Sequence, residues 1–286
     1  MKVRIKFTKL GSLRYIGHLD FMRAIQKIIR RSDVQAAFTK GYSPHLILSF
    51  AAPLGVGLEG TGEYFDLEVA YRDPFPLDKQ DFQRLETIGL QNDELPDPPH
   101  MEEICGMLNR EAPEGVLFTA CRRVSENKSK AMALVAKADY TVFIEDGFLP
   151  ETDFAPVLHD FMEKESIVVH KVSKKTESDV DIRPMIYELS ADPADLTFAA
   201  CVLRAQTEKE KQVAEEAAGR IRQAGYKRSV FMSLMTGSAA NLKPETVFQA
   251  VCMQNGVEYD PFAIRIVRHE LYAEDGRTLE MLGSRF

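Results

Sequence analysis

The stretch Lys2–Arg31, KVRIKFTKLGSLRYIGHLDFMRAIQKIIRR, carries the pattern that decides the fold. Charged and apolar residues alternate over Lys2–Lys9, which is the period of a strand with one buried face. From His18 to Arg31 the apolar residues recur instead at the spacing of a helix, and the basic residues lie on the opposite side. The stretch therefore predicts a strand, a turn and an amphipathic helix.

Farther along the chain, the order of the expected elements repeats. The hydrophobic pattern predicts strand, helix, strand, strand, helix and strand within the first 125 residues, and the same order returns between residues 137 and 286. This order is typical of the ferredoxin-like βαββαβ unit, in which two helices cover one face of an antiparallel sheet. We therefore predict an α+β protein with two tandem ferredoxin-like domains, 1–125 and 137–286, each with one sheet face uncovered. Residues 73–99, rich in Pro, Asp and Gln, are expected to form a surface insertion with a short helix.

The composition is that of a globular protein and excludes several other classes. Of the 286 residues, 45% are apolar and 28% are charged, and no run approaches the roughly 18 apolar residues that a membrane helix needs. The alternating N-terminus does not resemble a signal peptide. The four cysteines, Cys105, Cys121, Cys201 and Cys252, lie far apart and lack the spacing of metal ligands. We therefore expect no membrane span, no metal site, no cofactor, and a location in the reducing cytoplasm.

Basic residues are concentrated at the start of the chain. The whole sequence has 36 basic and 43 acidic residues, a net charge of −7, whereas the first 50 residues contain ten basic residues and two acidic ones. Four of the basic residues form one stripe on the expected helix: Arg23, Lys27, Arg30 and Arg31. This asymmetry predicts a surface for a polyanion or for an acidic partner. The alternative is a basic helix face that only contacts solvent.

The segment Arg14–Asp20, RYIGHLD, brings several reactive groups to the expected start of this helix. The imidazole of His18, the carboxylate of Asp20 and the guanidinium groups of Arg14 and Arg23 could bind a phosphate or carry out acid–base chemistry on a phosphodiester. The alternative is that His18 and Asp20 only cap the helix.

A turn is expected at Gly41–His45, GYSPH, and it contains an aromatic ring and a second histidine. Tyr42 could stack on a base, and His45 could contact a phosphate. The alternative is a purely structural turn imposed by Gly41 and Pro44.

Two further segments offer weaker candidates. Pro53–Gly62 has glycines whose N–H groups could surround an anion, but it lacks the Lys-Ser/Thr of a P-loop and precedes a strand, so a flexible connection is the alternative. Lys174 and Lys175 precede a strand on which Asp181 and Arg183 are expected to share one face. That pair could form an ion pair, or Arg183 could donate to a phosphate.

Several of these motifs resemble the bacterial radical SAM-linked protein family. The similar segments are LRYIGHLDFMR (Leu13–Arg23), GYSPH (Gly41–His45), SFAAPL (Ser49–Leu54), DIRP (Asp181–Pro184) and NLKPE (Asn241–Glu245). The resemblance covers most of the chain, and its specific part is the N-terminal block. Residues 205–236 depart from the family pattern, so we expect a second insertion there, with a charged helix near Glu208–Gln223.

The resemblance implies a partnership, because members of the family occur alone or fused behind a radical SAM enzyme. This chain lacks CxxxCxxC and cannot itself hold the cluster of such an enzyme. We therefore expect an accessory protein that binds structured RNA or docks substrate for a radical SAM enzyme. The expected nucleic-acid or anion contacts are Arg14, His18, Arg23, Lys27, Arg30, Arg31, Tyr42, His45, Lys174, Lys175 and Arg183.

Two other functions stay open from the sequence. One is a metal-independent ribonuclease of the CRISPR-associated RNA-processing kind, by analogy at the level of the fold. In that case His18 or His45 would be the general acid or base, and Asp20 and Arg23 would orient it and stabilise charge. The other is a pure protein-interaction module whose basic helix binds an acidic partner.

Overall fold

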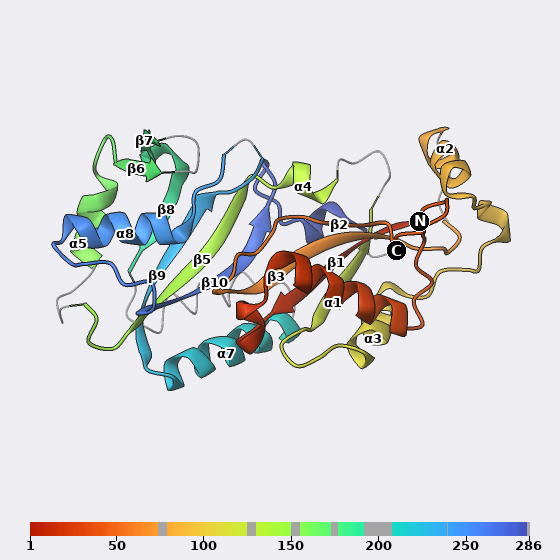
Figure 1. Ribbon diagram of the computed structural model, residues 1–286, viewed down its shortest axis with the longest axis horizontal. Coiled ribbons are helices and arrows are strands. Elements are labelled where there is room, and N and C mark those ends of the chain that lie inside the picture. The colour runs from red at the N-terminus through yellow and green to blue at the C-terminus, as the bar shows by residue number, and fades with distance from the viewer. Residues whose placement is uncertain are drawn as a thin grey trace. The chain divides into compact units, whose positions relative to one another are not determined.

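The computed structural model describes residues 1–73, 79–124, 130–149, 155–172, 177–191, 208–238 and 240–284 (Figure 1). The chain divides into two compact units. The first contains Met1–Val135 together with Leu271–Phe286, and the second contains Ala136–Glu270. The last 16 residues therefore belong to the first unit, whereas the sequence placed them in a second domain that ran to the end of the chain.

The first unit contains an antiparallel sheet with the order β4-β1-β3-β2. Its strands are β1 (Lys2–Lys9), β2 (Leu48–Phe50), β3 (Leu58–Glu68) and β4 (Phe118–Arg123). Its helices are α1 (His18–Arg31), α2 (Lys79–Ile88), α3 (Met101–Arg110) and α4 (Ala131–Leu134). Short 3₁₀ turns lie at Gly11–Tyr15, Asn92–Glu94 and, in the C-terminal segment, Glu280–Leu282.

One face of this sheet supports a hydrophobic core. Alternate residues of β1 point to this face, as the strand period requires, and they pack against the apolar sides of α1 and α3. The core residues include Val3, Ile5 and Phe7 from β1, Phe21, Ile25, Ile28 and Ile29 from α1, and Ile104 and Leu108 from α3. Helix α1 forms because its apolar residues recur along one side, so that burial of that side can stabilise a helix whose other side stays in water.

The opposite face of the sheet is covered, which contradicts the expectation of a free face. Arg4 and Lys6 point there and are buried, with exposed fractions of 1% and 4%. Arg4 donates to the backbone oxygen of Leu279 at 3.2 Å, and Lys6 lies 3.8 Å from the carboxylate of Glu280. The C-terminal segment therefore lies over the side of β1 that the alternating charges had assigned to solvent.

The second unit contains a sheet with the order β10-β5-β9-β8, in which β5–β9 and β8–β9 are antiparallel. The strands of this unit are β5 (Lys137–Glu145), β8 (Ile186–Ser190), β9 (Tyr226–Met235) and β10 (Ile264–Tyr272), with β6 (Val168–Val172) and β7 (Glu177–Asp181) in a separate hairpin. Its helices are α5 (Ala155–Met162), α7 (Glu208–Gln223) and α8 (Pro244–Gln254), and a 3₁₀ turn lies at Arg183–Met185. The expected α+β class with mostly antiparallel pairing is confirmed.

The predicted insertion at 205–236 is only partly an insertion. The charged helix is present as α7 over the expected residues Glu208–Gln223, but β9, which follows it, pairs along its length with β5 inside the sheet. Helix α7 packs through Ala218 and Ile221 onto Phe143 and Val267. Seven consecutive residues of β5 are buried, so both faces of that strand are covered and neither offers the uncovered face that we expected.

Candidate functional site

Helix α1 presents most of the exposed basic residues of the expected site. The helix begins at His18, after Gly17 in an extended conformation, and ends before Ser32. Its predicted basic stripe is exposed along its whole length: Arg23, Lys27, Arg30 and Arg31. Arg30 and Arg31 lie in the last turn, where cations are favoured by the helix dipole. The prediction of a basic helix face in solvent therefore agrees with the structure.

A tight hairpin holds Tyr42 and His45. The N–H of Thr39 donates to the backbone oxygen of His45 at 2.9 Å, and the N–H of His45 donates to Oγ1 of Thr39 at 3.0 Å. Gly41 has a φ of 122°, a backbone conformation that residues other than glycine rarely adopt. The ring of Tyr42, at the tip, is fully exposed.

Phe38 connects this hairpin to α1. The guanidinium of Arg30 lies over the Phe38 ring, 5.2 Å from its centroid, and Phe38 pairs with Leu46 at the base of the hairpin. The cation–π contact places the base of the hairpin beside the C-terminal half of α1. The exposed residues of α1 and of this hairpin are together named the α1 surface: Arg23, Lys27, Arg30, Arg31, Phe38, Tyr42 and His45.

His18 lies at the opposite end of α1 from Arg30 and Arg31 and lines a small cavity. Its half-buried ring lies 5.2 Å from the ring of Phe50 in an edge-on arrangement. The cavity, about 10 Å³ and no larger than a single water needs, is also lined by Lys9 and Glu63. Lys9 is 1% exposed and donates from Nζ to the backbone oxygen of Ile16 at 2.8 Å. The N-cap position is Gly17, so His18 is the first residue of the helix and not its N-cap.

The acid–base group expected at Arg14–Arg23 is not assembled. Asp20 pairs at the surface with Arg23 at 2.8 Å, and both side chains are about two-thirds exposed, at 69% and 68%. Arg14 is directed instead to the buried Glu59, at 3.5 Å, and its guanidinium lies over the ring of Tyr15. The carboxylate of Asp20, which was expected to act with His18, therefore pairs with Arg23.

The glycine-rich segment is not an anion cradle. Its second half, from Leu58 onward, is part of β3, and Gly60 to Gly62 are buried in that strand. A Cβ at Gly60 would lie 2.5 Å from Oε1 of Glu63, so the glycine permits this close approach. The N–H of Gly57 already donates to the backbone oxygen of Arg14 at 2.8 Å.

Asp181 and Arg183 also differ from their predicted arrangement. Asp181 ends β7, whereas Arg183 lies in a 3₁₀ turn that contains Pro184, so the two do not share one strand. Arg183 donates from Nε to the backbone oxygen of Met162 at 2.9 Å and from Nη1 to that of Ile186 at 3.3 Å. Its guanidinium therefore fixes local backbone. Lys174 and Lys175 lie outside the described residues.

The carboxylate of Asp181 is likewise used by backbone groups. The N–H groups of Ile167 and Arg183 donate to Oδ1 of Asp181 at 2.9 Å and 3.0 Å, and they hold the pKa of this carboxyl below its ordinary value of 3.8. The motif DIRP thus ties the end of α5 to the start of β6 and the end of β7.

Much of the positive charge of the first 50 residues is internal, which the sequence did not indicate. Arg4 forms a two-point ion pair with Asp66, with distances of 2.8 Å and 3.2 Å. Glu280 accepts from Arg122 and lies beside Lys6. The alternation of Lys2–Lys9 shows that these residues share a face, but it does not distinguish a face in water from a face covered by carboxylates. The external basic surface is therefore smaller than the composition suggests.

The described part of the chain holds no group of three His, Cys, Asp or Glu residues placed to bind a metal ion. Within the same residues, no helix has the length and apolar character to cross a membrane.

Comparisons with known proteins identify a family but no activity. A chain in the crystal structure of a Cbf5–Nop10–Gar1 complex matches with a TM-score of 0.41 and 10% sequence identity, over 96% of this chain and 50% of that chain. This chain thus spans about half the length of that structural neighbour. No curated protein matches the sequence. A family model described as "Uncharacterized protein conserved in bacteria (DUF2344)" matches residues 2–87 and 90–244, and because these make up most of the chain, the protein belongs to this bacterial family.

Proposed function

We propose that this protein binds RNA through the α1 surface and acts as a non-catalytic adaptor. The observation that carries the proposal is the row of exposed Lys27, Arg30 and Arg31 on one helix face, beside a hairpin with an exposed aromatic ring. Within the described residues, none of these three cations has a carboxylate at ion-pair distance. Phosphate groups can therefore bind them without first breaking a pair.

The hairpin supplies the second half of the recognition. Tyr42 is held away from the core by a turn that Gly41 permits, so a base can stack on its ring without any change of the backbone. Arg30 remains stacked on Phe38, which limits the freedom of its side chain and lowers the entropy lost when a phosphate binds. A phosphate contact and a stacked base next to it fit an unpaired loop or bulge of a structured RNA.

The surroundings of the histidines favour an adaptor over a ribonuclease. His18 lines a cavity about the size of one water, and Asp20 pairs with Arg23 at the surface. A general acid or base must reach the proton that it transfers. Asp20 is paired with Arg23 and is therefore not the group that orients His18, so we assign the histidines no catalytic role.

We also infer that each unit is a ferredoxin-like domain. Both sheets have the spatial order fourth, first, third, second strand when the strands of each sheet are numbered along the chain, with the separate pair β6 and β7 left out. This is the order that two interlocked β-α-β crossings produce. In the second unit, α7 is then an addition between the second and third strands.

The proposed partner is a radical SAM enzyme, and the support for it is the motif resemblance. In this arrangement the partner performs the chemistry, and this chain holds the RNA. Mild crosslinking in cells, followed by sequencing of the bound RNA and identification of the bound proteins, tests both partners together. A defined RNA with a radical SAM enzyme supports the adaptor. A protein partner without RNA makes the α1 surface a protein-docking site and overturns the phosphate contacts.

The RNA contact itself is tested with a charge reversal on α1. The change Lys27→Glu with Arg31→Glu is compared with Lys209→Glu and Arg220→Glu, which makes the same charge change at exposed positions of α7. Binding of a fluorescein-labelled RNA hairpin with an unpaired loop is followed by anisotropy at several salt concentrations. The α1 variant should lose most of the affinity, and its log–log salt slope should fall by about 1.4, roughly 0.7 for each lost contact to an unpaired phosphate.

The α7 variant should bind the hairpin as the unmodified protein does, apart from a small general charge effect. Equal losses in both variants would mean that only net charge matters, and the α1 surface would then not be the site.

A further inference from the structure

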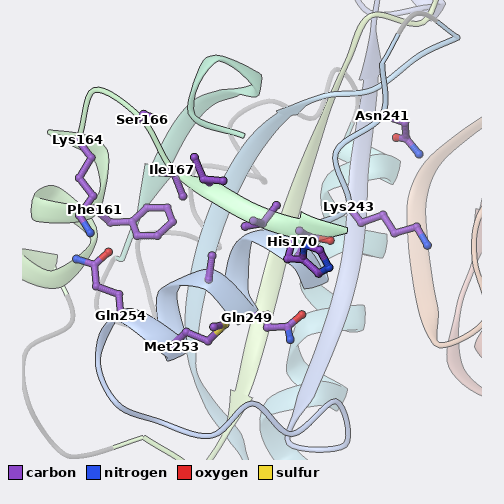
Figure 2. A pocket seen from close by; sticks show the side chains of 14 residues that line it. Phe161, Lys164, Ser166, Ile167, His170, Asn241, Lys243, Gln249, Met253 and Gln254 are labelled. Atoms are coloured by element: carbon purple, nitrogen blue, oxygen red, sulfur yellow. The ribbon is translucent and has the colours of Figure 1, made fainter. Parts of the chain in front are cut away.

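A large open groove crosses the second unit, and none of its described lining residues belongs to the α1 surface. Its volume is about 740 Å³, which is in the range of ligand sites. Figure 2 shows lining residues from three parts of this unit: Phe161 on α5 with Lys164 just after it, His170 on the strand β6 with Ile167 just before it, and Gln249 and Met253 on helix α8.

The helical wall of the groove is one continuous side of α8. Thr246, Gln249, Ala250 and Met253 recur at intervals of three, one and three residues, which places them on the same face. The opposite side of α8 supplies buried residues such as Val247 and Val251. Met253 is 71% exposed and, across the groove, Val168 is 61% exposed. Two large apolar side chains thus line a hollow that the described chain leaves open.

The other wall is the edge of a strand. Among the described residues, β6 pairs only with β7, so its second edge has no strand partner. An edge strand presents unpaired N–H and C=O groups to whatever lies beside it. Five consecutive residues from Ser166 to His170 line the groove, the last three of them in β6. Because side chains alternate between the two faces of a strand, an unbroken lining of this kind is what the edge of a strand presents.

This edge is fixed in position by the DIRP motif. The N–H of Ile167 donates to Oδ1 of Asp181 at 2.9 Å, and its backbone oxygen accepts from Ile182 at 2.8 Å. Ile167 and Ile182 are both buried. The start of β6 therefore needs little ordering before a partner strand can pair with it, which reduces the entropy lost on binding.

The described lining of the groove is positively charged, which favours an acidic ligand. The described lining residues include Lys164, Lys243 and His170, and none of them is acidic. The Nδ1 atom of His170 lies 2.8 Å from Asp179, so the two lysines supply the available positive charge. In Figure 2 they lie at opposite ends of the groove. The chain as a whole has a net charge of −7, so this positive lining is a local property.

We propose that the groove binds an extended acidic segment of a partner protein, which adds as a strand to the open edge of β6 and lies over α8. The main-chain groups of β6 bind the backbone of the segment, its apolar side chains pack on Val168 and Met253, and its carboxylates contact Lys164 and Lys243. The five residues of β6 span about 17 Å, so the segment needs roughly five or six residues in extended form.

The test uses the full-length protein and a phage-displayed library of random decapeptides. Selected peptides should alternate apolar residues with Asp or Glu. Synthetic copies of one selected peptide are then measured by anisotropy, once unmodified, once with each acidic residue replaced by Lys, and once with N-methyl groups on alternate backbone nitrogens. Both altered peptides should bind at least about ten-fold more weakly, the first through lost charge and the second through blocked strand pairing.

Two protein variants locate the site. Lys164→Glu with Lys243→Glu should weaken the acidic peptide by more than about ten-fold and improve the lysine peptide, whereas Lys209→Glu with Arg220→Glu should leave both unchanged. All four positions are exposed, so both proteins should fold normally. Selection of no peptide, selection of basic peptides, tolerance of N-methylation, or equal effects in both variants each overturns the proposal. RNA binding by the α1 surface is a separate measurement, so either result can fail alone.

Discussion

At the scale of single residues, the fate of the charges on β1 is the clearest departure from the sequence pattern. Arg4 is 1% exposed, and its guanidinium meets both carboxylate oxygens of Asp66. The same carboxylate accepts the N–H of Ala131 at 3.0 Å and lies 3.5 Å from Lys2. Removal of a charged group from water costs several kcal/mol, and a folded protein tolerates this cost only when the group finds hydrogen-bond partners inside. Asp66 is therefore the residue on which the covered face depends.

Replacement of Asp66 by Ala should lower the free energy of unfolding of the first unit by about 3 to 5 kcal/mol, because Arg4 is left charged and buried without its carboxylate. The double change Arg4→Met with Asp66→Leu should cost less than the single change, since it removes both charges. Hydrogen exchange of the β1 amides at increasing urea concentrations measures the free energy of unfolding of the first unit separately from that of the second. A double variant less stable than Asp66→Ala would contradict the argument.

The described cysteines should be unreactive in the folded protein. Cys105, Cys121 and Cys252 are buried, and burial raises the pKa of Cys252 to about 11 and that of Cys121 well above its ordinary value. At pH 8 only about one Cys252 in a thousand is then a thiolate, the reactive form. With Cys201→Ser as background, a thiol reagent should label no cysteine before urea is added and three afterwards. Rapid labelling without urea would show that the cores open readily.

At the scale of elements, the hairpin at Tyr42 supplies a prediction that is independent of charge. Tyr42→Ala should weaken binding of the RNA hairpin by about 1 to 3 kcal/mol, the range for one stacked base, without changing the salt slope. Tyr42→Phe keeps the ring and should bind normally. Tyr187→Ala removes another exposed tyrosine, on β8, and serves as the control. A changed salt slope in Tyr42→Ala would mean that the residue acts by positioning cations and not by stacking.

Elements that depend on local sequence were predicted accurately, and those that depend on distant partners were not. The amphipathic pattern of Met101–Arg110 predicts a helix, and α3 has these bounds, because helical periodicity is contained within the segment itself. The apolar residues of Val34–Phe38 predict a strand, but this segment forms only isolated bridges at Ala36 and Phe38. The strand expected over 181–189 is interrupted by a turn at Pro184, a residue that cannot donate to a sheet.

The candidate site also has a part that local sequence predicts and a part that depends on distant residues. The exposed basic stripe of α1 could be predicted, because the apolar residues of a single helix determine which side faces water. The surroundings of His18 and Arg14 could not be predicted, because Arg14 pairs with Glu59 and His18 shares a cavity lining with Glu63, and both carboxylates lie on a strand 45 residues later. The groove beside β6 was also missed. Lys164 and Lys243 are 79 residues apart in sequence, and only the folded second unit brings them to one lining.

At the scale of the whole molecule, the return of the C-terminal segment to β1 determines which surfaces remain for binding. The N–H of Arg123 donates to the backbone oxygen of Ser284, and the N–H of Ser284 donates back, both at 2.8 Å. Glu280 is 3% exposed between Arg122 and Lys6. No local pattern predicts a contact between residues so far apart in sequence. Its consequence is that RNA cannot use this sheet face while the segment is in place.

The last prediction tests this cover directly. Glu280→Gln keeps the shape of the side chain but removes the negative charge that pairs with the buried Arg122, so the free energy of unfolding of the first unit should fall by about 3 to 5 kcal/mol. Glu274→Gln makes the same change at an exposed position of the same segment and should have almost no effect. Hydrogen exchange of the β1 amides measures both variants. Under native conditions the RNA affinity of Glu280→Gln should match that of the unmodified protein, because the α1 surface is unchanged. A clear gain in affinity with a steeper salt slope would instead mean that the segment opens, and that the buried basic face of β1 is itself a binding surface.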